Sequence, residues 1–446
     1  TAQEKTLAGE GVDLVPEIPG LAFSEPKRFR KLTPAVHSWT PFYFNYDNIE
    51  AISSDETYKS AALGATVLFQ NLVGDGYGFI GYNLHEDPDP TTCLRFSSWR
   101  HSGHFKYTYS GLLPVIEVSA DLGDRASKEI IRVQQADVTG GKVSIFTSRT
   151  KKDSPFFEGS LRLYVPLKFN SGGLSRGVVP QLRYRFTNDV YNDRISLREV
   201  FGTEENSSWK EIGSLGKDHS SMLSTLDLSV RGYIMRDRAP SQSWPRLGIG
   251  AETGLRTRPG HSDYFSSTAY MYLYGYLPGV MQDQGIKLSA IVGKDFGGGR
   301  FSYPDMPASF LPRGFAETNF TSVANTCSPF RYKFSFDYSL PLLNLDWSWM
   351  SPVAYVKNLK IVPFADFAFN KFTVLEEFLI NMKEVRKATL ASFGTDIVFH
   401  LGNLFWLPYD SSFGVRYAYN SWTDIDKFPV QGLDHHYFGA IFSVSM

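Results

Sequence analysis

One arginine and one aspartate, placed in two separate short motifs, have the residue types needed for a buried ion pair. Arg313 is followed by Gly314 and Phe315 in a long connection, and Asp366 lies two residues after Phe364 in an alternating segment. A planar guanidinium can bind a carboxylate through two parallel hydrogen bonds, which fixes geometry as well as charge. Glycine lets the backbone turn close beside a wall. The sequence therefore predicts an Arg313–Asp366 pair that fastens a loop to a strand. The alternative is that Arg313 is an ordinary loop arginine and Asp366 is bonded elsewhere.

Other polar clusters are weaker candidates for chemistry. His101 and His104 lie three residues apart, but neither a carboxylate nor a cysteine accompanies them at the spacing of metal ligands. Asp434 precedes His435 and His436, which suggests the Asp–His pair of a hydrolase. A polar cluster at a loop mouth is the commoner explanation of that sequence. We therefore expect no catalytic residue, no metal site and no cofactor.

The composition excludes several classes of protein. The 446 residues carry 45 Lys and Arg against 46 Asp and Glu, so the chain has no basic field for nucleic acid. Apolar residues make up 42% and aromatic residues 15%, which excludes a disordered chain. Two cysteines, Cys93 and Cys327, are too few for a disulfide scaffold, although one bridge between them stays open. No apolar run reaches the ~18 residues of a membrane-spanning helix.

The elements that position these motifs are predicted to be β-strands. In 330–340, strict alternation separates an apolar row from a polar row, which indicates a strand with one apolar and one wet face. That length matches the ~9–11 residues with which a tilted strand crosses a bilayer. Similar alternation recurs in 157–169, 226–234, 391–401 and 413–420. The apolar row of 330–340 is Phe330, Tyr332, Phe334, Phe336, Tyr338 and Leu340, and the polar row is Arg331, Lys333, Ser335, Asp337 and Ser339.

About sixteen strands are predicted in this way. They are 60–73, 76–86, 104–121, 129–138, 141–149, 156–169, 176–188, 222–236, 245–257, 264–277, 285–296, 330–341, 359–370, 388–401, 411–421 and 435–446. Long connections alternate with compact links, as in outer-membrane barrels. The long connections are 189–221, 297–329, 371–387 and 422–434, and the compact links are 170–175, 237–244, 278–284 and 342–358. Tryptophans near the compact links suit an interfacial aromatic girdle; they are Trp244, Trp347, Trp349 and Trp406.

These patterns predict an all-β fold: a transmembrane antiparallel β-barrel of about 16 strands with a long loop folded into the lumen. Residues 1–56, rich in proline, are expected to be a linker or N-terminal extension, and 57–446 the barrel. The chain begins with Thr1, which suggests a processed product or part of a longer polypeptide. The alternatives are a soluble pair of β-sheets or a β-propeller, but no repeat of ~40–45 residues supports a propeller.

The paired motifs resemble those of the BamA-like superfamily of outer-membrane assembly and secretion barrels. Those proteins have sixteen strands, and the Arg-Gly-Phe/Tyr tip of the sixth outer loop docks in the lumen on a Phe-x-Asp-x-Gly motif of the thirteenth strand. Arg313-Gly314-Phe315 and Phe364-Ala365-Asp366 match in residue type, order and strand position. Ala368 stands where the family has glycine, which weakens the second motif. The resemblance covers about 285–446 well and 60–284 only by strand pattern.

The last strand resembles the C-terminal signal by which outer-membrane barrels are recognised for assembly. The alternative is an ordinary terminal strand, and the final methionine departs from the usual phenylalanine. The residues that would form this signal are Tyr437, Gly439, Phe442, Val444 and Met446.

The resemblance implies a bacterial outer-membrane protein that inserts or translocates proteins, with a weak seam between 60–73 and 435–446. The expected partners are the lipid bilayer and periplasmic or surface protein subunits, and nucleic acid is not expected. The family's periplasmic POTRA domains are not recognisable in 1–56, and residues 37–41 look more like chains in which a TolB-like propeller precedes the barrel. The second hypothesis is a plugged channel or scaffold barrel, and the third is an outer-membrane hydrolase.

Overall fold

The fold is taken from a computed structural model that describes most of the strands and one segment of the longest connection. No helix long and apolar enough to cross a membrane is found among these residues. The described residues are 34–43, 62–87, 98–123, 130–138, 141–151, 156–188, 191–192, 195–203, 206–215, 222–237, 242, 244–259, 266–281, 283–297, 306–315, 329–349, 354–375, 383–404, 410–423 and 434–445.

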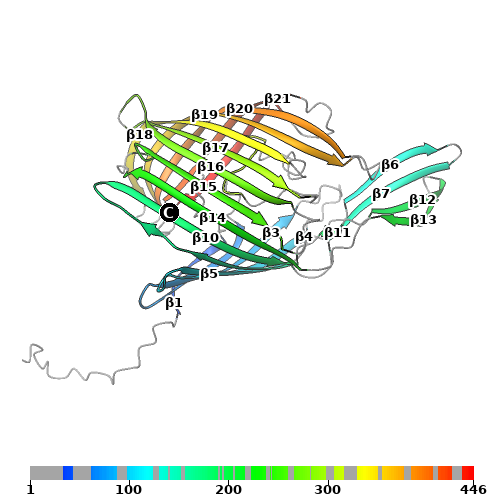
Figure 1. The fold of residues 1–446 in the computed structure, drawn as a ribbon, viewed down its shortest axis with the longest axis horizontal. Helices are drawn as coiled ribbons and strands as arrows, with labels where there is room; N and C mark the ends of the chain where they lie inside the picture. The colour runs from blue at the N-terminus through cyan, green and yellow to red at the C-terminus, as the bar shows by residue number, and fades with distance from the viewer. Residues whose placement is uncertain are drawn as a thin grey trace, which may run out of the picture.

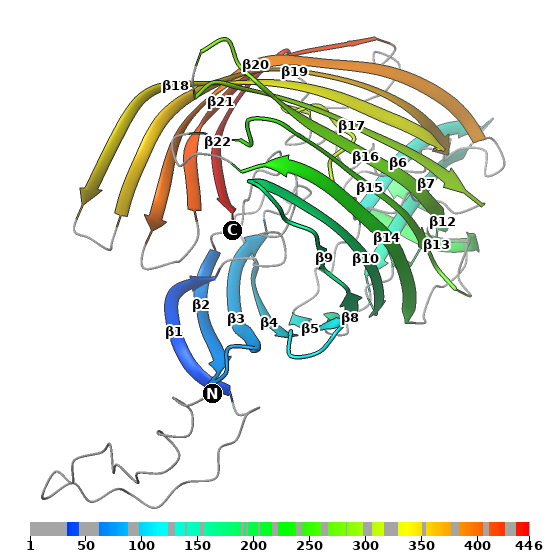
Figure 2. The same cartoon turned by 60° about the vertical axis from the view of Figure 1, so that its left-hand side comes forward.

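One antiparallel sheet of seventeen labelled strands forms most of the molecule and curls around a central space (Figures 1 and 2). Strands β8 and β9 both pair with β10 on either side of a break at Pro166, so the seventeen labels occupy sixteen positions. The prediction of about sixteen antiparallel strands is confirmed. The strands are β1 (Pro34–Tyr43), β2 (Ala62–Asn71), β3 (Gly76–Asp87), β4 (Ser98–Tyr109), β5 (Val115–Gly123), β8 (Phe156–Tyr164), β9 (Leu167–Lys168), β10 (Leu174–Thr187), β14 (Leu223–Arg236), β15 (Gly248–Thr257), β16 (Ser267–Pro278), β17 (Gly285–Phe296), β18 (Phe330–Trp349), β19 (Ala354–Leu375), β20 (Lys383–Leu404), β21 (Asp410–Thr423) and β22 (His436–Ser445).

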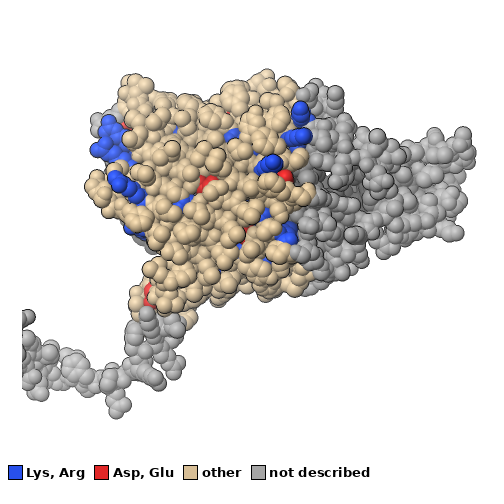
Figure 3. Space-filling view, viewed as in Figure 1, with Lys and Arg blue, Asp and Glu red and all other residues tan. Residues whose placement is uncertain are grey.

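The polarity of the sheet is inverted relative to a water-soluble protein. On β18, Tyr332 and Phe334 point outward and are 42% and 43% exposed. Their neighbours Arg331, Lys333 and Ser335 point inward and are at most 5% exposed. Figure 3 shows few charges over the middle of the outer face, with Lys and Arg gathered toward its two ends. A row of aromatic side chains turned away from the polar interior is the arrangement of a transmembrane barrel, and it excludes the soluble alternative of two sheets packed over those rows.

The first strand of the wall lies in the segment that was expected to be a linker. Residues 34–43 form β1, which pairs with β2, so the boundary of the barrel at residue 57 was wrong. Prolines hid this strand, because proline cannot donate to a ladder and is confined to strand starts, bulges and edges. Pro34 begins β1, and Pro41 lies in a register shift between Thr40 and Phe42. The edges of the sheet are therefore β1 and β22: the predicted edge 435–446 corresponds to β22, whereas 60–73 corresponds to β2 and is not an edge.

Two strands predicted for the wall belong elsewhere. Segments 129–138 and 141–149 correspond to strands of a separate five-stranded sheet, to which the predicted loop 189–221 also contributes. Figure 1 shows this small sheet projecting beyond the end of the wall. Alternation identifies a strand but does not identify its partner, which explains the error. The strands of this sheet are β6 (Ile130–Val138), β7 (Gly141–Lys151), β11 (Tyr191–Asn192), β12 (Ile195–Thr203) and β13 (Asn206–Leu215).

The predicted strand 104–121 is two strands, because a tight turn at 110–114 joins β4 to β5. The gain of β1 and of this extra strand offsets the loss of the two strands to the small sheet. Asp366 consequently lies on β19, at the thirteenth position of the sheet, as predicted. Residues 342–349 and 371–375, which were predicted to belong to connections, continue β18 and β19.

The exposed aromatic row generates a direct test of the membrane-facing surface. Phe334→Arg would place a charge against hydrocarbon, so we expect the free energy of folding into lipid vesicles to fall by about 2–4 kcal/mol. The matched change Val280→Arg, in the turn after β16 where the side chain is 90% exposed, should have little effect. The measurement is urea-dependent folding into phospholipid vesicles, followed by gel mobility. Equal losses for the two variants would contradict the assignment of the outer face.

Candidate functional site

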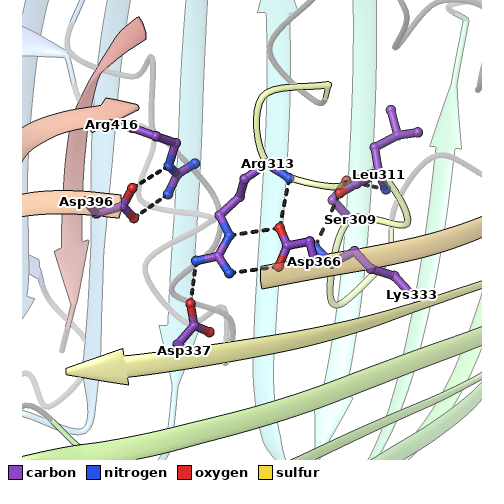
Figure 4. A network of polar contacts seen from close by, with 8 residues as sticks. All are labelled: Ser309, Leu311, Arg313, Lys333, Asp337, Asp366, Asp396 and Arg416. Carbon is purple, nitrogen blue, oxygen red and sulfur yellow. Dashed lines mark hydrogen bonds and ion pairs between the residues drawn. The ribbon is translucent and has the colours of Figure 1, made fainter. Parts of the chain in front are cut away.

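Residues 306–315 of the connection between β17 and β18 lie inside the curled sheet, against the inner faces of β16, β17, β18, β19 and β21. The second half of this segment, from Phe310 to Phe315, is buried throughout. Figure 4 shows the segment above the inner face of β18 and β19. The predicted long loop folded into the lumen is therefore present in this structure.

Arg313 makes a dense set of hydrogen bonds with two carboxylates of the wall (Figure 4). Its Nε donates to Asp366 Oδ2 at 2.9 Å and its Nη2 donates to Asp366 Oδ1 at 2.7 Å, while its backbone N–H also donates to Oδ2 at 2.9 Å. The remaining guanidinium nitrogen, Nη1, donates to Asp337 on β18. Asp366 is fully buried and Arg313 nearly so. A buried charge without partners is strongly destabilising, so the pair determines where the loop can lie.

Phe364 completes this arrangement from the same face of β19. The guanidinium carbon of Arg313 lies 3.9 Å from the centre of the Phe364 ring, a cation–π contact. On the other side of the network, Arg416 of β21 binds Asp396 of β20 through two hydrogen bonds of 2.8 and 2.9 Å, and its guanidinium lies 5.6 Å from the same ring. Phe364 thus contacts both the loop arginine and an arginine of the wall.

The tip of the loop fits closely against β21. Gly314 has a φ of +88°, and a Cβ atom at this position would lie 2.7 Å from Asn420 Oδ1 and 3.1 Å from the Ala418 Cβ. Both the backbone conformation and the space therefore require glycine. Phe315 is fully buried and packs edge-on against Trp422, with ring centres 5.9 Å apart. We refer to Arg313, Gly314, Phe315, Phe364 and Asp366, together with Asp337, as the loop lock.

Apolar contacts also hold the loop segment, at Ala308 and Phe310. Ala308 and Phe310 are buried in a cluster with a row of inward tyrosines on β16. The Phe310 ring also lies over Gly293 of β17 and under the guanidinium of Arg331, 4.4 Å from its centre. The partners of Ala308 and Phe310 in this cluster are Tyr272, Tyr274, Tyr276 and Ile291.

The C-terminal residues predicted to form an assembly signal are described only in part. The ring of Tyr437 occupies the space where Gly439 lacks a side chain, because a Cβ on Gly439 would collide with the Tyr437 hydroxyl. The side chains of Phe442 and Val444 and the whole of Met446 lie outside the described residues. The recognition role of this strand stays a prediction.

The structure does not bring the two histidines of the predicted metal pair together. His101 and His104 face opposite sides of β4, since residues three apart on a strand alternate; His101 bonds to the Tyr82 hydroxyl, and His104 faces the lumen. His435 stacks on Trp422 at 4.3 Å and its Nδ1 donates to the Asn420 carbonyl. Within the described ranges, no group of three or more His, Cys, Asp or Glu side chains is arranged to hold a metal. Cys93 and Cys327 lie outside those ranges.

Several residues of the site were not identified from the sequence. Asp337 and Lys333 were predicted only as members of the polar row of 330–340, yet Asp337 accepts from Arg313 and Lys333 donates to the Leu311 carbonyl at 3.3 Å. Both lie on the inward row of β18, so alternation places them on the correct face. Their contact with the loop depends on the register of β18 against β19, in which Asp337 lies opposite Phe364. For Phe310 and Trp422, nothing in the sequence pattern indicates a contact with the loop or the wall.

Comparison with known proteins gives a similarity of fold. No family model matches the chain, and no curated protein matches it. Among solved structures, CdiB from Escherichia coli is similar with a TM-score of 0.44 and 11% sequence identity. The similarity covers 87% of this chain and 60% of CdiB, so the chain spans less than two thirds of that protein.

The Arg313–Asp366 pair predicts how the loop is released. Asp366→Asn keeps the shape of the side chain but removes its charge, so we expect loop docking to weaken by about 3–5 kcal/mol. Trypsin should then cut residues 297–329 faster in vesicle-embedded protein. Asp396→Asn is the matched control, because it breaks an equally close arginine–carboxylate pair between two wall strands. Equal cutting rates in the two variants would contradict a role for Asp366 in holding the loop.

The tight fit at Gly314 generates a second prediction. Gly314→Ala should undock the tip, because the added methyl would collide with Asn420 in addition to straining the backbone. Gly297→Ala carries the backbone strain alone, about 1–2 kcal/mol, since Gly297 has a φ of +93° and nothing within 4 Å of the new Cβ. Hydrogen–deuterium exchange of a peptide covering 306–315 is the measurement. Faster exchange is expected only for Gly314→Ala.

Proposed function

We propose that this chain is a bacterial outer-membrane β-barrel of the BamA-like type that inserts or translocates proteins, with the loop lock keeping its longest loop inside the lumen. The observation that carries the proposal is the bonding of Arg313 to Asp366 and Asp337 within a sheet of inverted polarity. The order Arg-Gly-Phe on the loop and Phe-x-Asp on the thirteenth strand supports the family assignment on which this function rests.

The proposed mechanism is physical and requires no catalytic residue. The edge strands β1 and β22 have no backbone pairing with each other in the described residues, so the wall has a seam where an incoming strand can meet exposed N–H and C=O groups. At each of the other positions of the described sheet, a strand is paired with a neighbour on both sides. The partners of this activity are the lipid bilayer and periplasmic or surface protein subunits, and nucleic acid is not among them.

A second candidate function, a plugged channel or scaffold barrel in a larger complex, is favoured by the burial of the loop. Residues 310–315 fill part of the lumen and contact five strands, namely β16, β17, β18, β19 and β21. A loop that closes a pore must stay attached to the wall. A loop that moves during transport must be able to detach from the wall and bind it again. The lock is compatible with either use.

Reconstitution tests the leading proposal. The full chain, with any natural upstream region, is placed in phospholipid vesicles, and the folding rate of a small unfolded outer-membrane barrel is followed by gel mobility. We expect faster folding than in empty vesicles and than in vesicles holding an unrelated barrel. The same rate in all three would contradict the proposed activity.

Conductance in planar lipid bilayers distinguishes the second candidate. Current is recorded for the intact chain and for a variant lacking residues 300–328. A large, stable pore that appears only after the deletion would favour a plugged channel. If the deletion leaves the bilayer non-conducting while abolishing the acceleration of barrel folding, the loop acts in transport and not as a plug.

A further inference from the structure

Three inward side chains near the loop end of the wall form a chain of hydrogen bonds that neither the loop lock nor transport uses. Ser102 Oγ lies 3.0 Å from His104 Nε2, and His104 Nδ1 lies 2.6 Å from Asp121 Oδ1. A carboxylate only accepts, so Nδ1 carries the proton and Nε2 is left as the acceptor for the Ser102 hydroxyl. Each nitrogen of the imidazole therefore has the partner that a general base in a Ser–His–Asp triad requires.

The strands hold this arrangement in register. Ser102 and His104 are two residues apart on β4 and share its inner face, and Asp121 lies directly opposite His104 on β5. The side chains of His104 and Asp121 each remain 20% exposed, so a small molecule in the lumen can reach them. A site built on adjacent strands of a sheet is held more rigidly than one built on loops.

Stacking against an aromatic ring also fixes the orientation of the His104 imidazole. The Tyr43 ring of β1 stacks on His104 with centres 4.4 Å apart and planes 20° apart. Tyr43 can lie there because Gly81 of β3 has no side chain; a Cβ at that position would come within 2.5–2.6 Å of the ring. Stacking against a buried tyrosine limits rotation of the imidazole away from Ser102, which makes Tyr43 a positioning residue.

An asparagine lies beside Ser102 on the neighbouring strand. Asn83 lies directly opposite Ser102 in the register of β3 and β4. The Nδ2–H group of an asparagine beside a nucleophilic serine is the kind of donor that stabilises a tetrahedral oxyanion, whereas its Oδ1 only accepts hydrogen bonds.

Other serine–histidine contacts of the wall differ in chemistry. His400 bonds to Ser412 and His37 bonds to Ser38, in each case through Nδ1. In His104 the Nδ1 atom is bonded to a carboxylate and the Nε2 atom meets the serine. This combination is what distinguishes an activated serine from an ordinary polar contact.

We propose that Ser102, His104 and Asp121 form a hydrolytic site for small acyl esters that enter the lumen. Ser102 Oγ would attack the ester carbonyl carbon while His104 Nε2 takes its proton. The bond from that carbon to the alcohol oxygen then breaks, and the alcohol leaves with the proton from His104. Water, deprotonated by His104, attacks the acyl-serine; the carboxylic acid is released and Ser102 regains its proton. Asp121 holds the imidazole tautomer and stabilises its charged form throughout.

The test uses the folded full chain in lipid vesicles with a biotinylated fluorophosphonate, which bonds to an activated serine oxygen with loss of fluoride. We expect mass spectrometry to locate the label on Ser102. Ser102→Ala should abolish it and Asp121→Asn should slow it by roughly 10²–10⁴-fold. Hydrolysis of p-nitrophenyl butyrate should fall in parallel, and Asn83→Ala should lower this hydrolysis. Ser412→Ala is the matched control and should change neither rate, with circular dichroism confirming that each variant is folded.

Two outcomes would overturn the inference. The first is a wild-type chain in which Ser102 is unlabelled, a result that depends on no variant and hence on no question of folding. The second is labelling of Ser102 at the same rate in folded Asp121→Asn, which would reduce the contact to a structural hydrogen bond. Neither outcome bears on protein transport, because the loop lock and both edge strands are intact in the labelled protein.

Discussion

The organisation of this protein follows from the contact between its wall and hydrocarbon. A strand that presents phenylalanine and tyrosine outward must turn its arginine, lysine and aspartate side chains inward, where each needs a partner. The interior is therefore a lattice of cross-strand pairs, such as Lys106 with Glu117 and Arg416 with Asp396. A loop that enters this interior can be held by the same chemistry, and the loop lock is one more pair of this kind in which the arginine comes from the loop.

Two different interactions hold the loop segment, and they act on different parts of it. Arg313 is bonded to two carboxylates from neighbouring strands, which defines the direction of the tip more strictly than one partner would. Phe310 and Ala308 bury apolar surface against inward tyrosines, which is unusual in a lumen lined mainly by polar groups. The tyrosines are suited to this contact because each carries an apolar ring and a polar hydroxyl. The loop thus combines a specific polar anchor with a less specific apolar one.

Strand type and facing were predictable from the sequence because both depend on a two-residue period. The pairing of Arg313 with Asp366 was predictable because its residue types and intervening strands were informative. The added carboxylate of Asp337, the contact of Phe315 with Trp422 and the existence of β1 were not. The first two depend on register, which alternation leaves open, and the third was obscured by Pro34 and Pro41. The Ser102–His104–Asp121 contact was missed for a similar reason: the two histidines drew notice as a possible metal pair, whereas Asp121 lies on another strand.

The binding of Arg313 by two carboxylates also depends on the register in which β18 and β19 are paired. Asp337 comes from β18 and Asp366 from β19, and they face the same space only when Ser335 lies opposite Asp366. A slip of one residue would turn Asp366 toward lipid and leave the loop arginine with half of its ligands. The loop can therefore dock fully only when β18 and β19 are paired in the native register, because a shifted pair does not present both carboxylates to Arg313.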